Sequence, residues 1–284
     1  MRRLANTLLR PFGYTLLKTG TPGGKQVVQG SSILPPVLAT GDGENDPMLV
    51  PQGSDRRPVG SMEMLLEDLR ARGFQCRTLL DVGANRTWWS RMAKKVFAEA
   101  DFCLIEPQIE MKALMEKFCQ EFPGSSCFHA GAGAQKGKLT LTIWDDLYGS
   151  SFLPSPDENL KSSGRQREVE ILTIDGLIDS GRIRVPDLIK LDIQGFELEA
   201  LKGATKTFGQ TSVYILEVSF FSFSDVPGMP VFADVVAFMQ ERGYVAYDFP
   251  GFLRRPLDGA LGQCDICFVK SDGFLRVSND WGPA

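Results

Sequence analysis

The sequence predicts an α/β fold built on a doubly wound, mostly parallel sheet, and two observations support this fold class. Short apolar runs alternate with segments of helical periodicity from residue 61 to residue 270, which favours parallel strands with helices on both faces. Two of these runs, residues 78–82 and 187–191, have an aspartate at or next to their carboxyl end, and a glycine lies two or three residues after it. Because ligands bind outside the carboxyl ends of strands in such sheets, both ends are expected at one site.

The composition indicates an ordinary globular protein with one large domain and an appendage. The chain has 284 residues, of which 43% are hydrophobic and 23% charged, enough to bury a sizeable core. Its net charge of −4 gives little support to nucleic-acid binding, so no nucleic-acid partner is expected. With neither a segment that could span a bilayer nor a secretory hydrophobic stretch, the expected location is the cytoplasm.

The domain is expected to span residues 61–284, after an N-terminal part at residues 1–60. Residues 1–20 hold four basic side chains, several leucines and no acid. Three interpretations stay open: a frayed start that packs on the domain, an amphipathic helix at the periphery of an anionic membrane, or an organelle transit peptide. Residues 19–60 are rich in Gly, Pro, Ser and Asp, which indicates a linker or a loosely docked arm.

The first half of the domain reads as strand and helix units in alternation. Ser61 precedes leucines at helical spacing, which predicts a helix that Gly73 ends. Buried strands are then expected at residues 78–82, 102–105 and 126–130, with helices at residues 88–98 and 110–121.

The second half starts with an interruption of this alternation. Residues 138–144 and 168–173 each alternate apolar with polar side chains around a polar loop at residues 149–165, which predicts an inserted two-stranded arm. Strand and helix patterns then resume, with the last strand expected to be antiparallel. Helices are expected at residues 175–180, 197–202 and 231–242, and strands at residues 187–191, 213–218, 244–249 and 265–270.

The turn Asp81-Val82-Gly83-Ala84-Asn85 follows the first strand and is typical of a cofactor-binding turn. The pattern Gly-x-Gly-x-x-Gly is absent, which disfavours a dinucleotide, because its pyrophosphate needs those glycines. S-adenosylmethionine fits better, since it has no phosphate and its ammonium group favours a nearby acid. We therefore expect Asp81, Gly83, Ala84 and Asn85 to bind the cofactor.

The ends of the next two strands supply further cofactor-binding candidates. Glu106, before Pro107, lies about 20 residues past the glycine turn, where an acid that binds ribose hydroxyls is expected. Its alternative is a solvated acid at a helix start that the proline begins. Pro107, together with Gly131 and Ala132 at the end of the third strand, completes the expected cofactor site.

Together with a later block, these motifs resemble the FkbM family of S-adenosylmethionine-dependent methyltransferases. Four segments carry the resemblance: the turn at residues 81–85, Ile-Glu-Pro at 105–107, Thr-Ile-Asp at 173–175, and Lys-x-Asp-x-Gln-Gly-x-Glu-x-x-x-Leu-Lys-Gly-Ala at 190–204. The resemblance covers about residues 62–270. It implies the Rossmann-like class I methyltransferase sheet, S-adenosylmethionine as donor, and O-methylation of a sugar, glycan or natural-product acceptor.

Thr87 departs from the family turn, which usually reads Gly-Ala-Asn-x-Gly. If the position requires a positive φ, threonine costs about 1–2 kcal/mol; within a first helical turn it is acceptable. The departure concerns cofactor affinity more than fold. It motivates an alternative from another class, a catalytically degenerate methyltransferase-like module that binds a partner without turnover.

Removal of the proton from an acceptor hydroxyl is expected to fall to a carboxylate, with Asp192, Glu197 and Glu217 as catalytic candidates. Asp192 is the first choice because it ends the strand expected beside the cofactor turn. Glu197 could instead be a helix-start acid that favours the macrodipole, and Glu217 a structural acid. The single histidine, His129, is expected to be structural and partly buried.

Two other motifs are weaker. Cys264 and Cys267 lack the second pair that a zinc site needs, so no metal ligands are assigned, although a metal could assist the reaction. Ser150 and Ser151 lie in the polar loop, which is read as a plain surface loop or as a lid over the acceptor.

Overall fold

The computed structural model describes residues 60–223, 228–280 and 282. The expected membrane-contacting segment at residues 1–20 and the linker at residues 19–60 lie outside the described residues, apart from Gly60. Among the described helices, none combines the length and the apolar character needed to cross a bilayer.

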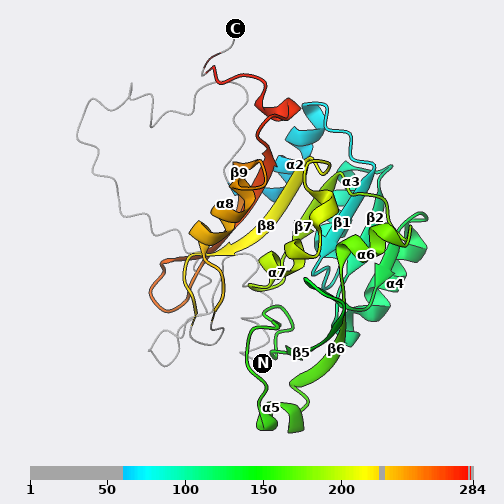
Figure 1. Cartoon of the computed structure of the whole chain (residues 1–284), viewed down its shortest axis with the longest axis vertical. Coiled ribbons are helices and arrows are strands. Elements are labelled where there is room, and N and C mark those ends of the chain that lie inside the picture. Colours follow the sequence, from blue (N-terminus) through cyan, green and yellow to red (C-terminus); the bar gives the residue numbers. More distant parts are fainter. Residues whose placement is uncertain (1–59, 224–227, 281, 283–284) are drawn as a thin grey trace, which may run out of the picture. The chain divides into compact units, whose positions relative to one another are not determined.

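The described part is centred on a seven-stranded sheet in the order β3-β2-β1-β7-β8-β10-β9 (Figure 1). The parallel strands are β1 (Thr78–Val82), β2 (Asp101–Ile105), β3 (Ser126–Phe128), β7 (Leu188–Leu191) and β8 (Val213–Ser219). The antiparallel strand β10 (Leu261–Lys270) lies between β8 and β9 (Tyr244–Arg254). This sheet confirms the predicted class I methyltransferase fold with its terminal antiparallel strand.

Helices cover both faces of the sheet, because consecutive strand residues contribute to two different cores. Leu79 and Leu188 belong to one buried cluster, and their neighbours Leu80 and Ile189 to the other. The first cluster includes residues of α2 (Met62–Ala71), α3 (Trp88–Val96) and α4 (Lys112–Glu121). The second includes residues of α6 (Ile174–Asp179), α7 (Glu197–Lys202) and α8 (Phe232–Gln240). Burial on both faces explains why the parallel strands read as continuous apolar runs.

Short 3-10 turns complete this layer: η3 (Ile109–Met111) before α4, η4 (Thr205–Thr207) after α7, and η5 (Phe274–Arg276) after β10. The start of α2 follows the expected capping, since the Ser61 hydroxyl accepts a hydrogen bond from the Met64 amide at 3.4 Å.

The inserted arm has a third short strand that the sequence did not predict. Its sheet has the order β4-β6-β5, with β4 (Gly131–Ala132), β5 (Gly137–Thr142) and β6 (Gln166–Leu172). In Figure 1, β5 and β6 lie below the central sheet. The strand expected at residues 126–130 ends at Phe128, and the chain leaves the central sheet to pair with β6. The loop expected at residues 149–165 contains a short helix, α5 (Glu158–Ser162).

The carboxyl ends of β2, β1 and β7 lie side by side. Val82 of β1 pairs with Ile105 of β2 on one side and with Leu191 of β7 on the other. The strand order reverses between β1 and β7, and ligands bind at such switch points. Gly83 has φ +83°, and a Cβ there would lie 2.0 Å from the carbonyl oxygen of Asp192. The two predicted motifs therefore approach so closely that only glycine fits at position 83.

Candidate active site

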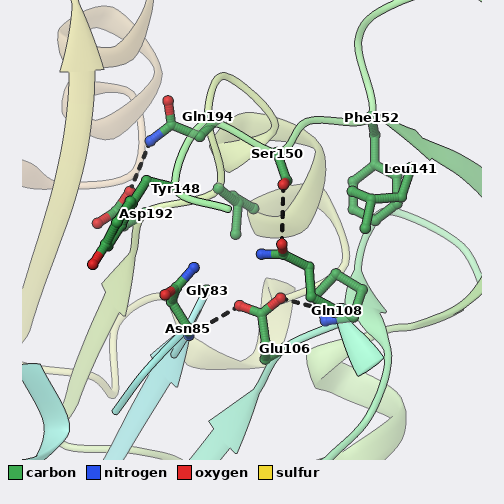
Figure 2. Close-up of a pocket in the computed structure, with 12 residues that line it drawn as sticks. Gly83, Asn85, Glu106, Gln108, Leu141, Tyr148, Ser150, Phe152, Asp192 and Gln194 are labelled. Atoms are coloured by element: carbon green, nitrogen blue, oxygen red, sulfur yellow. Dashed lines mark hydrogen bonds between the residues drawn. The ribbon is translucent and has the colours of Figure 1, made fainter. Parts of the chain in front are cut away.

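A pocket with about 480 Å³ of empty space, part of it open solvent, lies at these three strand ends (Figure 2). It is lined by residues after β1, β2 and β7 and by residues between Leu141 and Phe152: Gly83, Asn85, Glu106, Pro107, Gln108, Leu141, Tyr148, Ser150, Phe152, Asp192, Ile193 and Gln194.

Five of the predicted site residues line this pocket together: Gly83, Asn85, Glu106, Pro107 and Asp192. The other predicted site residues are not among its lining residues: Asp81, Ala84, Gly131, Ala132, Glu197 and Glu217. Ala84, Gly131 and Ala132 are buried. A Cβ on Gly131 would lie 2.6 Å from the Phe152 ring, so this glycine allows β4 to pack under a pocket residue.

Glu106 is held by two backbone amides at the centre of the pocket wall. One carboxylate oxygen accepts from the Asn85 amide and the other from the Gln108 amide, each at 2.9 Å (Figure 2). Glu106 is only 3% exposed. Burial raises its pKa to about 7, although the two amide hydrogen bonds oppose the rise. This carboxylate links the glycine turn to the end of β2.

The loop after β5 closes over the same wall. The Leu147 carbonyl accepts hydrogen bonds from the Asn85 side chain at 2.7 Å and from the Gln108 side chain at 3.2 Å. The Ser150 hydroxyl donates to the side-chain amide oxygen of Gln108 at 3.1 Å, and the Ser151 hydroxyl donates to the backbone carbonyl of Gln194 at 2.9 Å. For the two serines the sequence left open a plain surface loop or a lid, and Gln108 was missed. Gln108 directly follows Glu106-Pro107 in the sequence, and this position could have identified it as a site residue.

Asp81 and Lys190 form a buried pair behind the pocket. The register of β1 and β7 places them opposite one another, with Lys190 Nζ 3.9 Å from Asp81 Oδ1. Asp81 is fully buried and also accepts a hydrogen bond from the Ser90 hydroxyl. Burial raises the pKa of Asp81, and the Lys190 ammonium counteracts this rise.

Lys190 connects this buried pair to the pocket. Its Nζ donates to Asp192 Oδ2 at 3.0 Å. Burial by itself lowers the pKa of Lys190, but the Asp192 and Asp81 carboxylates together raise it above its ordinary value. Lys190 therefore stays charged and holds Asp192 at the pocket wall.

Gln194 joins Asp192 to a second acid, the partly buried Glu217. Its side-chain amide donates to Asp192 Oδ1 at 3.1 Å (Figure 2). The same amide donates to Glu217 Oε2 at 2.7 Å. Gln263 donates to the same Glu217 oxygen at 3.1 Å. Burial, and then the charge of Asp192, raises the pKa of Glu217 well above its ordinary value. Glu217 thus contacts the pocket through Gln194.

Glu197 caps the turn before α7. One of its carboxylate oxygens accepts from the Ile193 amide at 2.9 Å and from the Gly195 amide at 3.3 Å. Burial raises its pKa to about 7, and these amides oppose the rise. The geometry matches the alternative in which Glu197 stabilises a helix start.

Thr87 has the positive φ that the family glycine accommodates. Its φ is +62° at the N-cap of α3, where its side chain makes no capping hydrogen bond. A β-branched residue in this conformation costs about 1–2 kcal/mol. The Thr87 hydroxyl accepts a hydrogen bond from Arg91 Nε at 3.2 Å, which partly offsets this strain.

His129 differs from its expectation of partial burial, since it is exposed. Its Nδ1 lies 3.2 Å from the Glu106 carbonyl oxygen. This contact forms because the chain leaves the central sheet directly after Phe128. Cys264 and Cys267 are both buried in β10, and within the described ranges no three His, Cys, Asp or Glu side chains are grouped to hold a metal ion.

The chain is similar to the O-methyltransferase TomG from Streptomyces achromogenes, involved in tomaymycin synthesis and solved in complex with S-adenosylmethionine. The TM-score is 0.42 and the sequence identity 11%, over 73% of this chain and 79% of TomG.

Two curated relatives match parts of the chain. Hexuronic acid methyltransferase AglP of Haloferax volcanii is 32% identical over 72 residues, which is 24% of this chain and 30% of AglP. Methyltransferase sdnD of Sordaria araneosa is 25% identical over 154 residues, which is 44% of this chain and 59% of sdnD. The matches therefore span less than two thirds of either relative.

A family model covers the site itself. The methyltransferase FkbM domain matches residues 81–246, more than half of the chain. This range begins at Asp81 and includes Glu106 and the block after Lys190. The chain belongs to the FkbM methyltransferase family.

Proposed function

We propose that this chain transfers the methyl group of S-adenosylmethionine to a hydroxyl oxygen of a sugar, glycan or natural-product acceptor. The observation that carries the proposal is the placement of Glu106 and Asp192 around one pocket at the reversal of strand order. Family membership supports the donor. The name of one relative, a hexuronic acid methyltransferase, supports a sugar acceptor.

The pocket residues suit such a donor. Glu106 offers carboxylate oxygens to ribose hydroxyls, and Gly83 leaves room for a close backbone approach. Asp192 follows β7, on the other side of β1 from Glu106. Its negative charge suits the positive sulfonium of the donor. Pro107 and Asn85 also line the pocket.

The proposed reaction is an in-line displacement at the methyl carbon. The bond between carbon and sulfur breaks, a bond between carbon and the acceptor oxygen forms, and the hydroxyl proton passes to Asp192. Lys190 and Gln194 hold the two oxygens of Asp192, so the carboxylate keeps one orientation. Alignment of the reacting atoms supplies much of the rate in such transfers.

Donor binding is expected to strengthen as pH rises through about 7, the pKa of Glu106 in the free protein. Ribose hydroxyls favour the charged carboxylate, and Glu106 is already buried, so a ligand adds hydrogen bonds with little further desolvation. The folded pKa exceeds the unfolded one, so Glu106 makes folding stability fall as pH rises from about 4.5 to about 7. Donor binding reverses this effect by lowering the pKa again.

Calorimetry with S-adenosylhomocysteine at about pH 6 and about pH 8, in buffers of different ionisation enthalpy, measures the proton released. Glu106→Gln should weaken binding by about 1–3 kcal/mol and remove its pH dependence. Glu116→Gln, an exposed change on α4, is the matched control. Equal pH dependence in Glu106→Gln and the wild type would remove Glu106 from the donor site.

Methyl transfer itself is tested with radiolabelled S-adenosylmethionine and a panel of carbohydrate and lipid-linked acceptors. Calorimetry with S-adenosylmethionine and with NADH runs in parallel. Transfer to a hydroxyl acceptor supports the proposal. Donor binding with no transfer to any acceptor favours the degenerate module, for which the strained Thr87 is the motive, and binding of NADH alone overturns both.

We also propose that residues 1–20 contact anionic membranes, on the basis of their four basic side chains and absent acids. Each basic residue near such a surface contributes roughly 1 kcal/mol, and salt weakens the effect. Changing Arg2, Arg3, Arg10 and Lys18 to glutamine should abolish co-flotation of the full chain with anionic liposomes. The control changes four exposed lysines of the domain: Lys112, Lys117, Lys138 and Lys161. Unaltered flotation of the first variant refutes the contact.

A further inference from the structure

Tyr148, which lines the pocket, forms a cluster of one cation and two aromatic rings with Arg86 and Trp88. The Arg86 guanidinium carbon lies 5.8 Å from the centre of the Trp88 ring and 5.7 Å from that of Tyr148. The two ring centres are 6.2 Å apart, with 43° between the ring planes. Both rings face solvent, with Trp88 59% and Tyr148 44% exposed. We call these three residues the rim cluster.

The Arg86 guanidinium has no anionic partner within the described part of the chain. It makes neither an ion pair nor a side-chain hydrogen bond there, and its Nε is buried without an acceptor. By contrast, Arg165 and Arg167 each pair with a carboxylate. Arg167 Nε is likewise buried without an acceptor, so what distinguishes Arg86 is a guanidinium with no carboxylate partner among these residues.

The rim cluster is continuous with the proposed active site. Tyr148 lines the pocket together with Asn85 and Asp192 (Figure 2). Its position is fixed because the preceding Leu147 carbonyl accepts hydrogen bonds from Asn85 and Gln108. Arg86 directly follows Asn85, at the position that the family turn Gly-Ala-Asn-x-Gly leaves open. A molecule held at the rim therefore reaches toward Asp192.

The chemistry of the rim cluster selects a ring that carries negative charge. A guanidinium binds carboxylate and phosphate oxygens through paired N–H donors. Exposed aromatic faces give a flat apolar surface for the C–H face of a sugar ring. We propose that the rim cluster binds an anionic sugar as the methyl acceptor, with Arg86 on its carboxylate or phosphate and Trp88 and Tyr148 against its ring. This inference rests on the proposed function.

The donor S-adenosylmethionine also carries a carboxylate, so Arg86 could bind either the donor carboxylate or the anionic group of the acceptor. The exposed ring faces favour the acceptor, because the donor carboxylate brings no ring to cover Trp88. The donor instead is expected between Glu106 and Asp192, which lie at the strand ends. Independent measurements of donor and acceptor binding distinguish these sources.

The test measures sugar binding to the full chain saturated with S-adenosylhomocysteine, by ligand-detected NMR. The probes are methyl β-glucuronide, its uncharged counterpart methyl β-glucoside, and glucose 6-phosphate. The wild type should bind a charged probe at least about fivefold more tightly than the glucoside. Arg86→Gln should remove this preference, with a loss of about tenfold for the charged probe. Arg86→Lys should keep part of it, and Trp88→Ala should weaken charged and neutral probes alike.

Arg184→Gln is the matched control, because Arg184 is exposed and pairs with Asp101 at the opposite end of β2. The glucuronide and the phosphate distinguish the two anion types. Absence of a charge preference in the wild type, including absence of any binding, overturns the inference. Loss of S-adenosylhomocysteine binding in Arg86→Gln overturns it too, because Arg86 then serves the donor. If the wild type binds no S-adenosylhomocysteine in calorimetry, the proposed function fails instead.

Discussion

Replacing Lys190 with methionine is expected to lower the free energy of unfolding by about 3–5 kcal/mol at neutral pH, the usual cost of leaving one charge of a buried pair alone. Lys190 is buried between Asp192 and the fully buried Asp81. Without the ammonium, Asp81 keeps only the hydrogen bond from Ser90. Urea denaturation followed by circular dichroism measures the loss.

The deficit should shrink as pH falls. Burial already raises the pKa of Asp81, and removing Lys190 raises it further. A folded pKa above the unfolded value means that the folded state binds more protons, so stability falls as pH rises through that interval. The variant therefore regains stability in acid, where Asp81 is neutral.

Two further variants make the interpretation of Lys190→Met specific. The double variant with Asp81→Asn should recover much of the loss, because it removes the uncompensated charge. Lys138→Met is the matched control, since Lys138 forms an exposed pair with Glu170 worth at most about 1 kcal/mol. A loss below about 1 kcal/mol for Lys190→Met would contradict a charged, structurally required pair.

The core strands were predictable from the sequence because burial on both faces makes them continuous apolar runs. The strand at residues 78–82 has the predicted bounds, and all five of its residues are buried. By contrast, β4 consists of Gly131 and Ala132, which have no periodicity to read. β9 was expected to end at residue 249 but continues through Pro250 to Arg254. It continues because Gly251 lets the strand pass close to the Asp265 carboxylate of β10, where a Cβ would lie 2.0 Å from an oxygen.

The candidate site divides in the same way. Glu106 and Asp192 were predictable because strand ends of a parallel sheet meet at one edge. Tyr148, Gln108 and Gln194 were missed because their places depend on a loop without periodicity that closes through side-chain hydrogen bonds. Asp81 lies opposite Lys190 because of the register between β1 and β7. The sequence pattern does not predict that register, so this pair was not predictable.

Asp192→Asn is expected to lower kcat by about 10²–10⁴, the usual contribution of a general base. Affinity for S-adenosylhomocysteine, which carries no sulfonium charge, should change little. Asp192 lines the pocket, and its side chain is 33% exposed, so an acceptor hydroxyl can reach it. Asparagine keeps the shape and the hydrogen bond from Lys190 but cannot take a proton at this position. The measurement pairs single-turnover methyl transfer with calorimetry of S-adenosylhomocysteine.

The other pocket carboxylate, Glu106, supplies the comparison that decides this assignment. Glu106 is bound by two backbone amides and is expected to act on donor affinity, so Glu106→Gln should change the dissociation constant more than kcat. Asp145→Asn, an exposed change beside Arg165, controls for loss of one negative charge. If Asp192→Asn loses donor affinity and rate equally, Asp192 holds the donor ammonium rather than the acceptor proton. Full activity in Asp192→Asn would remove it from proton transfer, and sensitivity to chelators would then favour a bound metal as the activating group.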